Sequence, residues 1–186
     1  MGKSSDHIFD ELLILKCQAG DNSAMALLVK RWHVRLVRQA FHQTHNTEAA
    51  QDIAQDTWHT IIRKINLLRD PSRFRVWAYR IVNNKSVDWI RRQQKDRKIT
   101  ESQQELNAID TSSSEVEDDI QKLRRALREM PTKERFILNL FYLEGQSVRE
   151  IAETIGIPVG TVKSRLFKAR EHLKTIYKEV SHEKIK

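Results

Sequence analysis

The stretch from Gly145 to Lys174 constrains the fold of this chain most strongly, because it carries the start and stop signals of two short, consecutive helices. Ser147 followed by Glu150 forms a capping box, in which the hydroxyl and the carboxylate each accept a hydrogen bond from a backbone N–H at the helix start. Gly156 ends that helix because glycine tolerates the left-handed C′ conformation, and Pro158 prevents the helix from continuing. A second helix opens directly afterwards. This pattern predicts a helix-turn-helix, a motif whose second helix lies in the major groove of DNA.

The second helix of this motif has two different sides when its residues are placed on a wheel at about 100° per residue. The apolar side is predicted to face the first helix and contains Val162, Leu166, Ala169 and Leu173. The opposite side is polar and basic and contains Gly160, Lys163, Ser164, Phe167, Lys168 and Glu171. Phe167 is the large apolar residue on this side, and a thymine methyl group or a sugar would cover it on DNA. The alternative is an ordinary αα-hairpin with a solvated basic side, which is disfavoured because cap, turn and helix sides agree.

The composition favours a nucleic-acid partner and a helical fold. The chain has 186 residues, a formal net charge of +8 and a pI near 9.7, so its partners are expected to be polyanions. Its low content of glycine and proline favours helix. It contains no apolar run near the roughly 20 residues of a membrane helix and no signal-peptide pattern, so we expect no membrane insertion and a cytoplasmic location. Cys17, the single cysteine, excludes an intramolecular disulfide and is interpreted as a buried helix residue.

Apolar spacing divides the chain into two sets of helices separated by a polar segment. Helices are predicted over residues 7–19, 23–42, 47–68 and 74–92, and then over 118–129 and 132–144 ahead of the helix-turn-helix. The first of these helices rests on the spacing of Ile8, Leu12, Leu15 and Ala19. The segment from Gln93 to Glu117 loses this periodicity and is typical of a flexible linker. We therefore predict an all-α fold with two small helical domains, residues 1–95 and 118–186, joined by a linker over residues 96–117.

The helix over residues 47–68 combines a buried stripe with an acidic and polar stripe. The buried stripe is predicted to contain Ala49, Ile53, Trp58, Ile61, Ile62 and Ile65. The acidic and polar stripe contains Glu48, Asp52, Gln55, Asp56 and His59. In so basic a chain, an acidic stripe should not point at DNA. It is either a solvated side that complements the helix dipole or a docking surface for a basic protein partner.

The helix that begins at Phe74 carries aromatic residues on one side and arginine and asparagine on another. Its core side is predicted to contain Phe74, Trp77, Ala78, Ile81 and Val82, and its polar side Arg80, Asn84 and Arg91, flanked by Asn83 and Val87. The loop Asn66–Arg73 precedes it and is predicted to close with a helix cap at Ser72. Such a surface suits single-stranded DNA, because cations follow the phosphates while polar and aromatic groups hold unstacked bases. The alternative is that the aromatic residues are simply core, which we favour for Trp77.

The sequence gives little support for catalysis or metal binding. His42, His45 and Glu48 are the one candidate metal set, but they fall at a turn between helices and no other ligand cluster accompanies them. There is no phosphate-cradling glycine loop and no nucleophile–base pattern. We therefore predict no enzymatic activity, no metal and no cofactor, and we keep a metal-dependent nuclease as a disfavoured alternative.

Taken in order, these features resemble the extracytoplasmic-function (ECF) sigma factors, bacterial transcription initiation subunits that contain only the domains σ2 and σ4. The resemblance rests on Gln55-Asp56-Thr57, on Phe74 with the segment Trp77–Asn83, and on the segment Pro158–Arg170, and it covers nearly the whole chain. The last segment alone also resembles LuxR-type regulators, whereas the combination is specific. The resemblance implies a σ2 four-helix domain followed by a flexible linker and a σ4 helix-turn-helix domain.

The resemblance implies three sets of functional residues. Docking on the β′ clamp helices of RNA polymerase would fall to Glu48, Asp52, Gln55 and Asp56. Capture of the −10 element as a single strand with a flipped base would fall to the loop Asn66–Arg73, which includes Arg73, and to Arg80, Asn83, Asn84 and Arg91. The −35 element would be read by Lys163, Ser164, Phe167 and Lys168 beside Gly160, with Thr161, Arg165 and Arg170 nearer the phosphates. Many family members have arginine where this chain has Lys163 and Lys168, and lysine does not make the same bidentate contact with guanine.

The resemblance also implies the partners. These are core RNA polymerase, through its β′ clamp helices and β flap, promoter DNA and an anti-sigma factor, with the chain a monomer when free. The predicted function is that of an alternative sigma factor for promoter-specific transcription initiation. The alternative is a stand-alone helix-turn-helix regulator, which would bind duplex DNA without polymerase and would leave the acidic helix and the Arg/Asn helix without a role.

Overall fold

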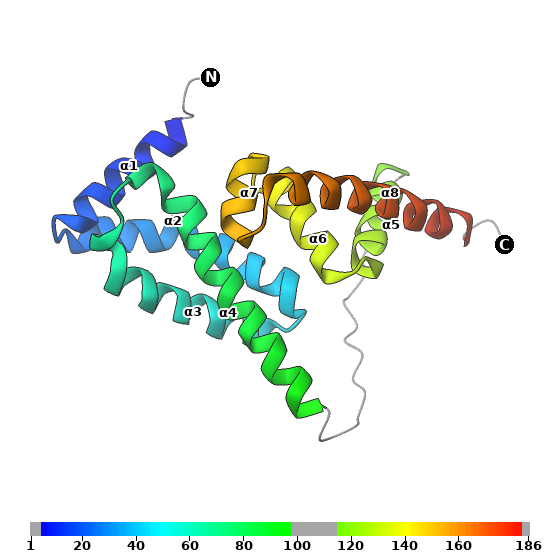
Figure 1. The fold of residues 1–186 in the computed structure, drawn as a ribbon, viewed down its shortest axis with the longest axis horizontal. Coiled ribbons are helices and arrows are strands. Elements are labelled where there is room, and N and C mark those ends of the chain that lie inside the picture. Colours follow the sequence, from blue (N-terminus) through cyan, green and yellow to red (C-terminus); the bar gives the residue numbers. More distant parts are fainter. Residues whose placement is uncertain (1–4, 98–114, 184–186) are drawn as a thin grey trace. The chain divides into compact units, whose positions relative to one another are not determined.

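The computed structural model describes residues 5–97 and 115–183, and every regular element within these ranges is a helix. The chain divides into two compact units, residues 1–93 with 153–156 and residues 94–152 with 157–186; Figure 1 colours the helices in chain order. The all-α prediction is confirmed. Part of the predicted linker, residues 98–114, lies outside the described residues, while its two ends belong to helices. The limits 1–95, 96–117 and 118–186 for the domains and the linker stay a prediction.

The first unit contains four long helices and two short 3₁₀ turns. They are α1 (Ser5–Gln18), α2 (Asn22–Thr44), α3 (Thr47–Lys64), η1 (Ile65–Leu67), η2 (Pro71–Arg73) and α4 (Phe74–Arg97). Local side-chain caps begin two of the long helices: the Asp21 carboxylate accepts from the N–H groups of Ser23 and Ala24, and the Asn46 side chain accepts from the N–H of Ala49. Such caps satisfy backbone donors that a helix start leaves without partners.

Aromatic rings join α2 to α4 in the core of the first unit. The Trp32 ring is almost fully buried and meets the Phe74 ring edge to face at a centroid distance of 5.2 Å. The Tyr79 ring lies 5.9 Å from the same indole. These contacts fix which side of α4 turns inward, because Phe74 and Tyr79 both come from that helix.

The buried side of α1 differs from the side that its apolar spacing indicates. Ile8, Leu12 and Leu15 are about half exposed and Ala19 is exposed, whereas Leu13, Ile14 and Cys17 are buried. Asp10 is also on the buried side, where its carboxylate accepts a hydrogen bond of 2.9 Å from Nε of Arg31. Apolar residues surround most of this helix, so contacts with α2 and with the η1–η2 loop decide which of them become core.

The segment beyond Gln94 forms the second set of helices. They are α5 (Glu115–Glu129), α6 (Thr132–Leu138), the π-helical turn η3 (Asn139–Leu143), α7 (Val148–Ile155) and α8 (Val159–Glu183). The predicted helix over residues 132–144 is thus an α-helix only in its first half. Helix α8 continues to Glu183 with Val180 buried, so the part of the tail that the structure describes is held by packing.

A buried arginine closes the C-terminal end of α5. Arg135 is 5 % exposed, and its Nη1 donates hydrogen bonds to the carbonyls of Leu127 at 2.9 Å and Arg128 at 3.1 Å. Burial lowers the pKa of this guanidinium from its ordinary value. The carbonyls at the C-terminal end of a helix carry partial negative charge and lack partners within the helix. A cation that donates hydrogen bonds to them therefore stabilises the helix end.

Candidate functional site

The helix-turn-helix forms through the contacts that the sequence predicts. The Ser147 N–H donates to the Glu150 carboxylate at 2.7 Å, and the Glu150 N–H donates to the Ser147 hydroxyl at 3.2 Å. Gly156 follows α7 with a positive φ of 76°, and the Ile157 N–H donates to the Ala152 carbonyl at 3.1 Å. The capping box and the glycine stop are both confirmed, because each depends on atoms only a few residues apart.

Burial confirms the two predicted sides of the second helix, α8. Val162, Leu166 and Ala169 are buried, whereas Leu173, which was predicted to share their side, is partly exposed. The predicted DNA-facing residues Gly160, Lys163, Ser164, Arg165, Phe167, Lys168 and Arg170 are exposed, and Thr161 is partly exposed. The Phe167 side chain is 66 % exposed among these polar and basic neighbours. An aromatic group so placed is available to the methyl and sugar groups of a DNA groove.

Arg170 differs from the other basic residues of α8 in having aromatic partners within its own unit. Its guanidinium carbon lies 5.3 Å from the Phe141 ring centroid and 5.5 Å from that of Tyr142. These distances are typical of cation–π contacts. A phosphate contact by Arg170 would therefore compete with the η3 rings, and this residue is a weaker candidate for DNA binding than its neighbours.

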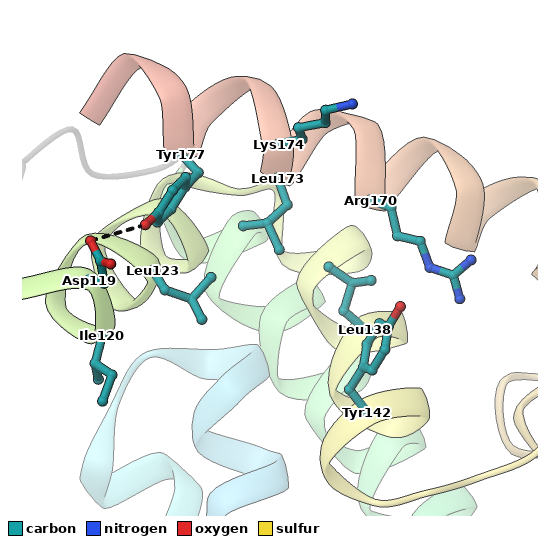
Figure 2. A pocket seen from close by; sticks show the side chains of 9 residues that line it. All are labelled: Asp119, Ile120, Leu123, Leu138, Tyr142, Arg170, Leu173, Lys174 and Tyr177. Carbon is teal, nitrogen blue, oxygen red and sulfur yellow. Dashed lines mark hydrogen bonds between the residues drawn. The ribbon is translucent and has the colours of Figure 1, made fainter. Parts of the chain in front are cut away.

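A groove of about 580 Å³ lies between α5, the α6–η3 segment and the C-terminal half of α8. It is lined by Asp119, Ile120, Leu123, Leu138, Tyr142, Arg170, Leu173, Lys174 and Tyr177. Figure 2 shows the Leu123, Leu138 and Leu173 side chains pointing into it, with the Tyr177 hydroxyl donating to Asp119 over 3.4 Å at one end. No pattern in the sequence predicts this groove. A π-helical turn carries Tyr142 to its edge, and such turns are frequent at functional sites.

The acidic stripe on α3 is exposed along its whole length. Glu48, Asp52, Gln55 and Asp56 are all exposed, while Ala50, Ile53, Ala54 and Thr57 on the opposite side are buried. The Asp56 carboxylate lies 3.6 Å from Nζ of Lys85 on α4. The stripe therefore has the exposure that a docking surface requires. Ile62, which was predicted to belong to the buried stripe, is half exposed.

Helix α4 presents Arg80, Asn84 and Arg91 to solvent. The prediction of Trp77 as core is wrong in part, because its ring is partly exposed and lies one helical turn before Arg80. Asn83 was predicted to contact DNA but is only 7 % exposed, since it shares the inward side of α4 with Tyr79 and Ser86. The solvent-accessible side of α4 therefore contains the Trp77 indole, and it does not contain the Asn83 amide that the sequence predicted there.

The loop before α4 is held by a cap at Asp70 rather than at Ser72. The Asp70 carboxylate accepts hydrogen bonds from the Ser72 N–H at 2.9 Å and from the Ser72 hydroxyl at 2.7 Å. Arg73 follows and is exposed, as are Asn66 and Leu67. Because the donor is Ser72 and the acceptor is Asp70, the loop closes two residues earlier than the sequence suggested.

In the part of the chain that the structure describes, no three histidine, cysteine, aspartate or glutamate side chains come together as a metal site. His45, a member of the candidate metal set, instead occupies the left-handed position after α2 with a φ of 52°. No helix in the described ranges is long and apolar enough to cross a membrane.

Comparison with known proteins places this chain in one family. The model for sigma-70 region 2 matches residues 28–96, and the model for sigma-70 region 4 matches residues 120–173. The RNA polymerase sigma-H factor of Pseudomonas aeruginosa is 30 % identical over 174 residues, which cover 87 % of this chain and 90 % of that protein. The ECF sigma factor SigW of Bacillus subtilis is 27 % identical, with 87 % of this chain and 92 % of that protein covered.

Solved structures show the same fold. CnrH, in its complex with the cytosolic domain of CnrY, aligns with a TM-score of 0.66 at 24 % identity, covering 92 % of this chain and 98 % of that one. The sigma factor RpoE of Bartonella quintana, in complex with the anti-sigma factor NepR, aligns with the same TM-score at 21 % identity, covering 81 % of this chain and 94 % of that one.

The two matched regions and the relatives show that this chain belongs to the sigma-70 family, in its extracytoplasmic-function group. It is an alternative sigma factor for transcription initiation, and the stand-alone regulator is not favoured.

Proposed function

We propose that this sigma factor divides promoter recognition among three surfaces: the acidic stripe of α3, the exposed side of α4 with its preceding loop, and the basic side of α8. The observation that carries the proposal is the presence of the first two surfaces on neighbouring helices of one unit, joined by the Asp56–Lys85 pair. A stand-alone regulator has no use for either surface. A sigma factor needs both, because it must be held by polymerase while it holds opened DNA.

The acidic stripe is the proposed polymerase-docking surface. Glu48, Asp52, Gln55 and Asp56 are exposed and would meet the β′ clamp helices. Charge complementarity of this kind steers association and excludes wrong partners. Lys85 already offsets part of the charge of Asp56, but an exposed pair of this type contributes only about 0–1 kcal/mol and would rearrange readily on docking.

The exposed side of α4 and the loop Asn66–Arg73 are the proposed site for the melted −10 element. Arg73, Arg80 and Arg91 would follow the phosphates, Asn84 would bind base edges, and Trp77 would stack on an unpaired base. Extruding a base costs a few kcal/mol, and stacking on an aromatic ring returns roughly 1–3 kcal/mol per base. Asn83 is left out of this surface because it is buried.

The basic side of α8 is the proposed reader of the −35 element in the major groove. Lys163, Ser164 and Lys168 would bind base edges, and Phe167 would contact a thymine methyl group. Each good bidentate contact with a base contributes about 1–3 kcal/mol of discrimination, and lysine lacks the rigid planar fork with which arginine makes such contacts. Gly160, Thr161 and Arg165 lie at positions suited to close approach and phosphate contact.

The groove of the second unit is the proposed seat of a protein partner, the β flap of polymerase. Its leucine floor would take an apolar helix, and Arg170 and Lys174 would meet acidic residues of that helix. An anti-sigma factor is a further proposed partner, because two structural relatives were solved with the cytosolic domain of CnrY and with NepR. The chain itself carries out no chemical step and is proposed to act with polymerase in the cytoplasm.

The domain limits 1–95 and 118–186, with a linker over 96–117, are part of the same proposal. The family models stop at residue 96 and resume at residue 120, which supports these limits. The linker would let the two DNA-reading surfaces reach elements that are separated along the promoter.

A binding experiment with and without core polymerase tests the proposal. Promoter fragments selected by in vitro transcription with purified core should be bound tightly by the holoenzyme and weakly by the free protein. Melting of the −10 region, followed by permanganate reactivity of unpaired thymines, should require the holoenzyme. Tight binding of duplex DNA by the free protein, with no change on adding core, would exclude this function in favour of a stand-alone regulator.

A further inference from the structure

The side chain of Gln18 connects the end of α1 to the loop between α3 and α4. Its Nε2 donates one hydrogen bond of 2.8 Å to the carbonyl of Ile65 and a second of 2.8 Å to the carbonyl of Leu68. The Ile65 carbonyl also accepts from the Leu68 N–H at 3.1 Å. One amide group therefore holds both ends of the turn that presents Asn66 and Leu67.

The two ends of this connection are themselves held in place. Helix α1 is anchored by Leu13, Ile14 and Cys17, all buried, and Cys17 directly precedes Gln18. The turn that follows α1 is stabilised by two backbone hydrogen bonds of 3.0 Å. The Gly20 N–H donates to the Cys17 carbonyl, and the Asp21 N–H donates to the Lys16 carbonyl. Because Gln18 is part of this rigid helix end, its side-chain amide loses little conformational freedom when it donates hydrogen bonds. It therefore fixes the positions of the Ile65 and Leu68 carbonyls.

The turn between the two accepting carbonyls is strongly exposed. Leu67 is 74 % exposed, Asn66 is exposed beside it, and the rest of the loop is closed by the Asp70 cap. Without the Gln18 amide, the η1 end of the turn would be held only by the burial of Ile65 and by the hydrogen bond from the Leu68 N–H to the Ile65 carbonyl. A loop that selects one base among four needs both ends held, because selection depends on precise positions. In catalytic sites, a displacement of about 1 Å lowers the reaction rate by up to two orders of magnitude.

We infer that Gln18 is a positioning residue for −10 recognition: it holds the Asn66–Leu67 turn in the conformation that selects the captured base, without touching DNA itself. This inference rests on the proposed role of the loop. Gln18 lies ahead of residues 28–96, the segment that matches the region 2 model, so the constraint comes from outside the matched segment.

The test uses the holoenzyme and two pools of promoter templates, one randomised in the −10 element and one in the −35 element. Wild-type protein, Gln18→Met and Gln18→Glu are compared by sequencing the transcripts. Methionine keeps the length of glutamine but has no N–H donor, and glutamate places a carboxylate against two carbonyl oxygens. Gln43→Met is the matched control, because Gln43 is a buried glutamine on α2 of the same unit.

Each Gln18 variant should lose roughly tenfold in enrichment of the preferred base at one or two −10 positions, as expected for two hydrogen bonds. Selectivity in the −35 pool and affinity for core should stay unchanged, and Gln43→Met should keep the wild-type −10 profile. Two results would overturn the inference. One is an unchanged −10 profile in Gln18→Met. The other is a lower Tm of the variant together with an equal fall in transcription from every template, which would show a loss of stability only. Failure of the wild-type protein to enrich any −10 sequence would instead overturn the proposed function on which it rests.

Discussion

Replacing Asp56 by lysine should remove docking on core polymerase while the first unit stays folded. The Asp56 side chain is 66 % exposed and lies 3.6 Å from Lys85. An exposed ion pair contributes about 0–1 kcal/mol, so its loss and the new repulsion lower the free energy of unfolding by roughly 1 kcal/mol. A like-charge contact in an interface costs several kcal/mol, and about 3 kcal/mol weakens affinity on the order of 100-fold.

The assay is a titration of fluorescently labelled protein with core polymerase, followed by anisotropy, with thermal unfolding measured in parallel. The matched variant combines Asp56→Lys with Lys85→Asp. It restores an ion pair between α3 and α4 with the charges exchanged, so its stability should return to that of the wild-type protein. Its docking should remain impaired, because a lysine still stands where the polymerase meets an acidic residue.

Two results would refute this reasoning. If the exchanged variant regained affinity for core, Asp56 would act by pairing with Lys85 and not by contacting polymerase. If the single variant bound core with unchanged affinity, the acidic stripe would be a solvated helix side.

Three further predictions concern the recognition helix, the buried cation and a helix cap. Phe167→Ala should reduce selectivity for one −35 position by roughly 1 kcal/mol, measured by competition between single-base variants of the promoter, with core affinity unchanged as the control. Arg135→Ala should lower the free energy of unfolding of the second unit by about 2–4 kcal/mol in urea titrations, because the side-chain packing is lost and two carbonyls at the end of α5 lose their donor. Arg135→Met should recover only the contribution of packing. A stability equal to the wild type in both variants would contradict the capping role. Hydrogen bonds from the Ser23 hydroxyl and the Ala24 and Ser23 N–H groups lower the pKa of Asp21 from its ordinary 3.8. The ionised cap therefore stabilises α2 fully above pH 3.8, the ordinary pKa. The difference in Tm between the wild type and Asp21→Asn should shrink as the pH falls through the lowered pKa of Asp21. A difference in Tm that stays constant with pH would contradict this role of the carboxylate.

Local signals predicted the helix-turn-helix well. The capping box at Ser147 and Glu150 and the stop at Gly156 involve atoms within a few residues of one another, so the backbone itself brings them together. The cap at Asp21 is equally local, because its partners are the N–H groups of Ser23 and Ala24. The sides of α8 also followed from spacing, because Val162, Leu166 and Ala169 occupy a single buried stripe.

Spacing was a weaker guide where a helix carries apolar residues on several sides. The stripe of Ile8, Leu12 and Leu15 is exposed on α1, and Trp77 is partly exposed on α4 where Tyr79 is buried. Periodicity says which residues share a side but not which side meets a neighbour. Asn83 is the opposite case: it is a polar residue that was predicted to contact DNA, and it is buried.

What the sequence determined by itself is the class of fold, the helix-turn-helix and the charge on each helix side, because these depend on short-range geometry and on composition. Tertiary packing alone decided that Gln18 holds the Ile65 and Leu68 carbonyls, that Arg135 closes α5, and that the π-helical turn opens a groove against α8. In the first of these, the partners are 47 and 50 residues apart in the chain. No local rule connects groups at such separations; only the packed core brings them within hydrogen-bonding distance.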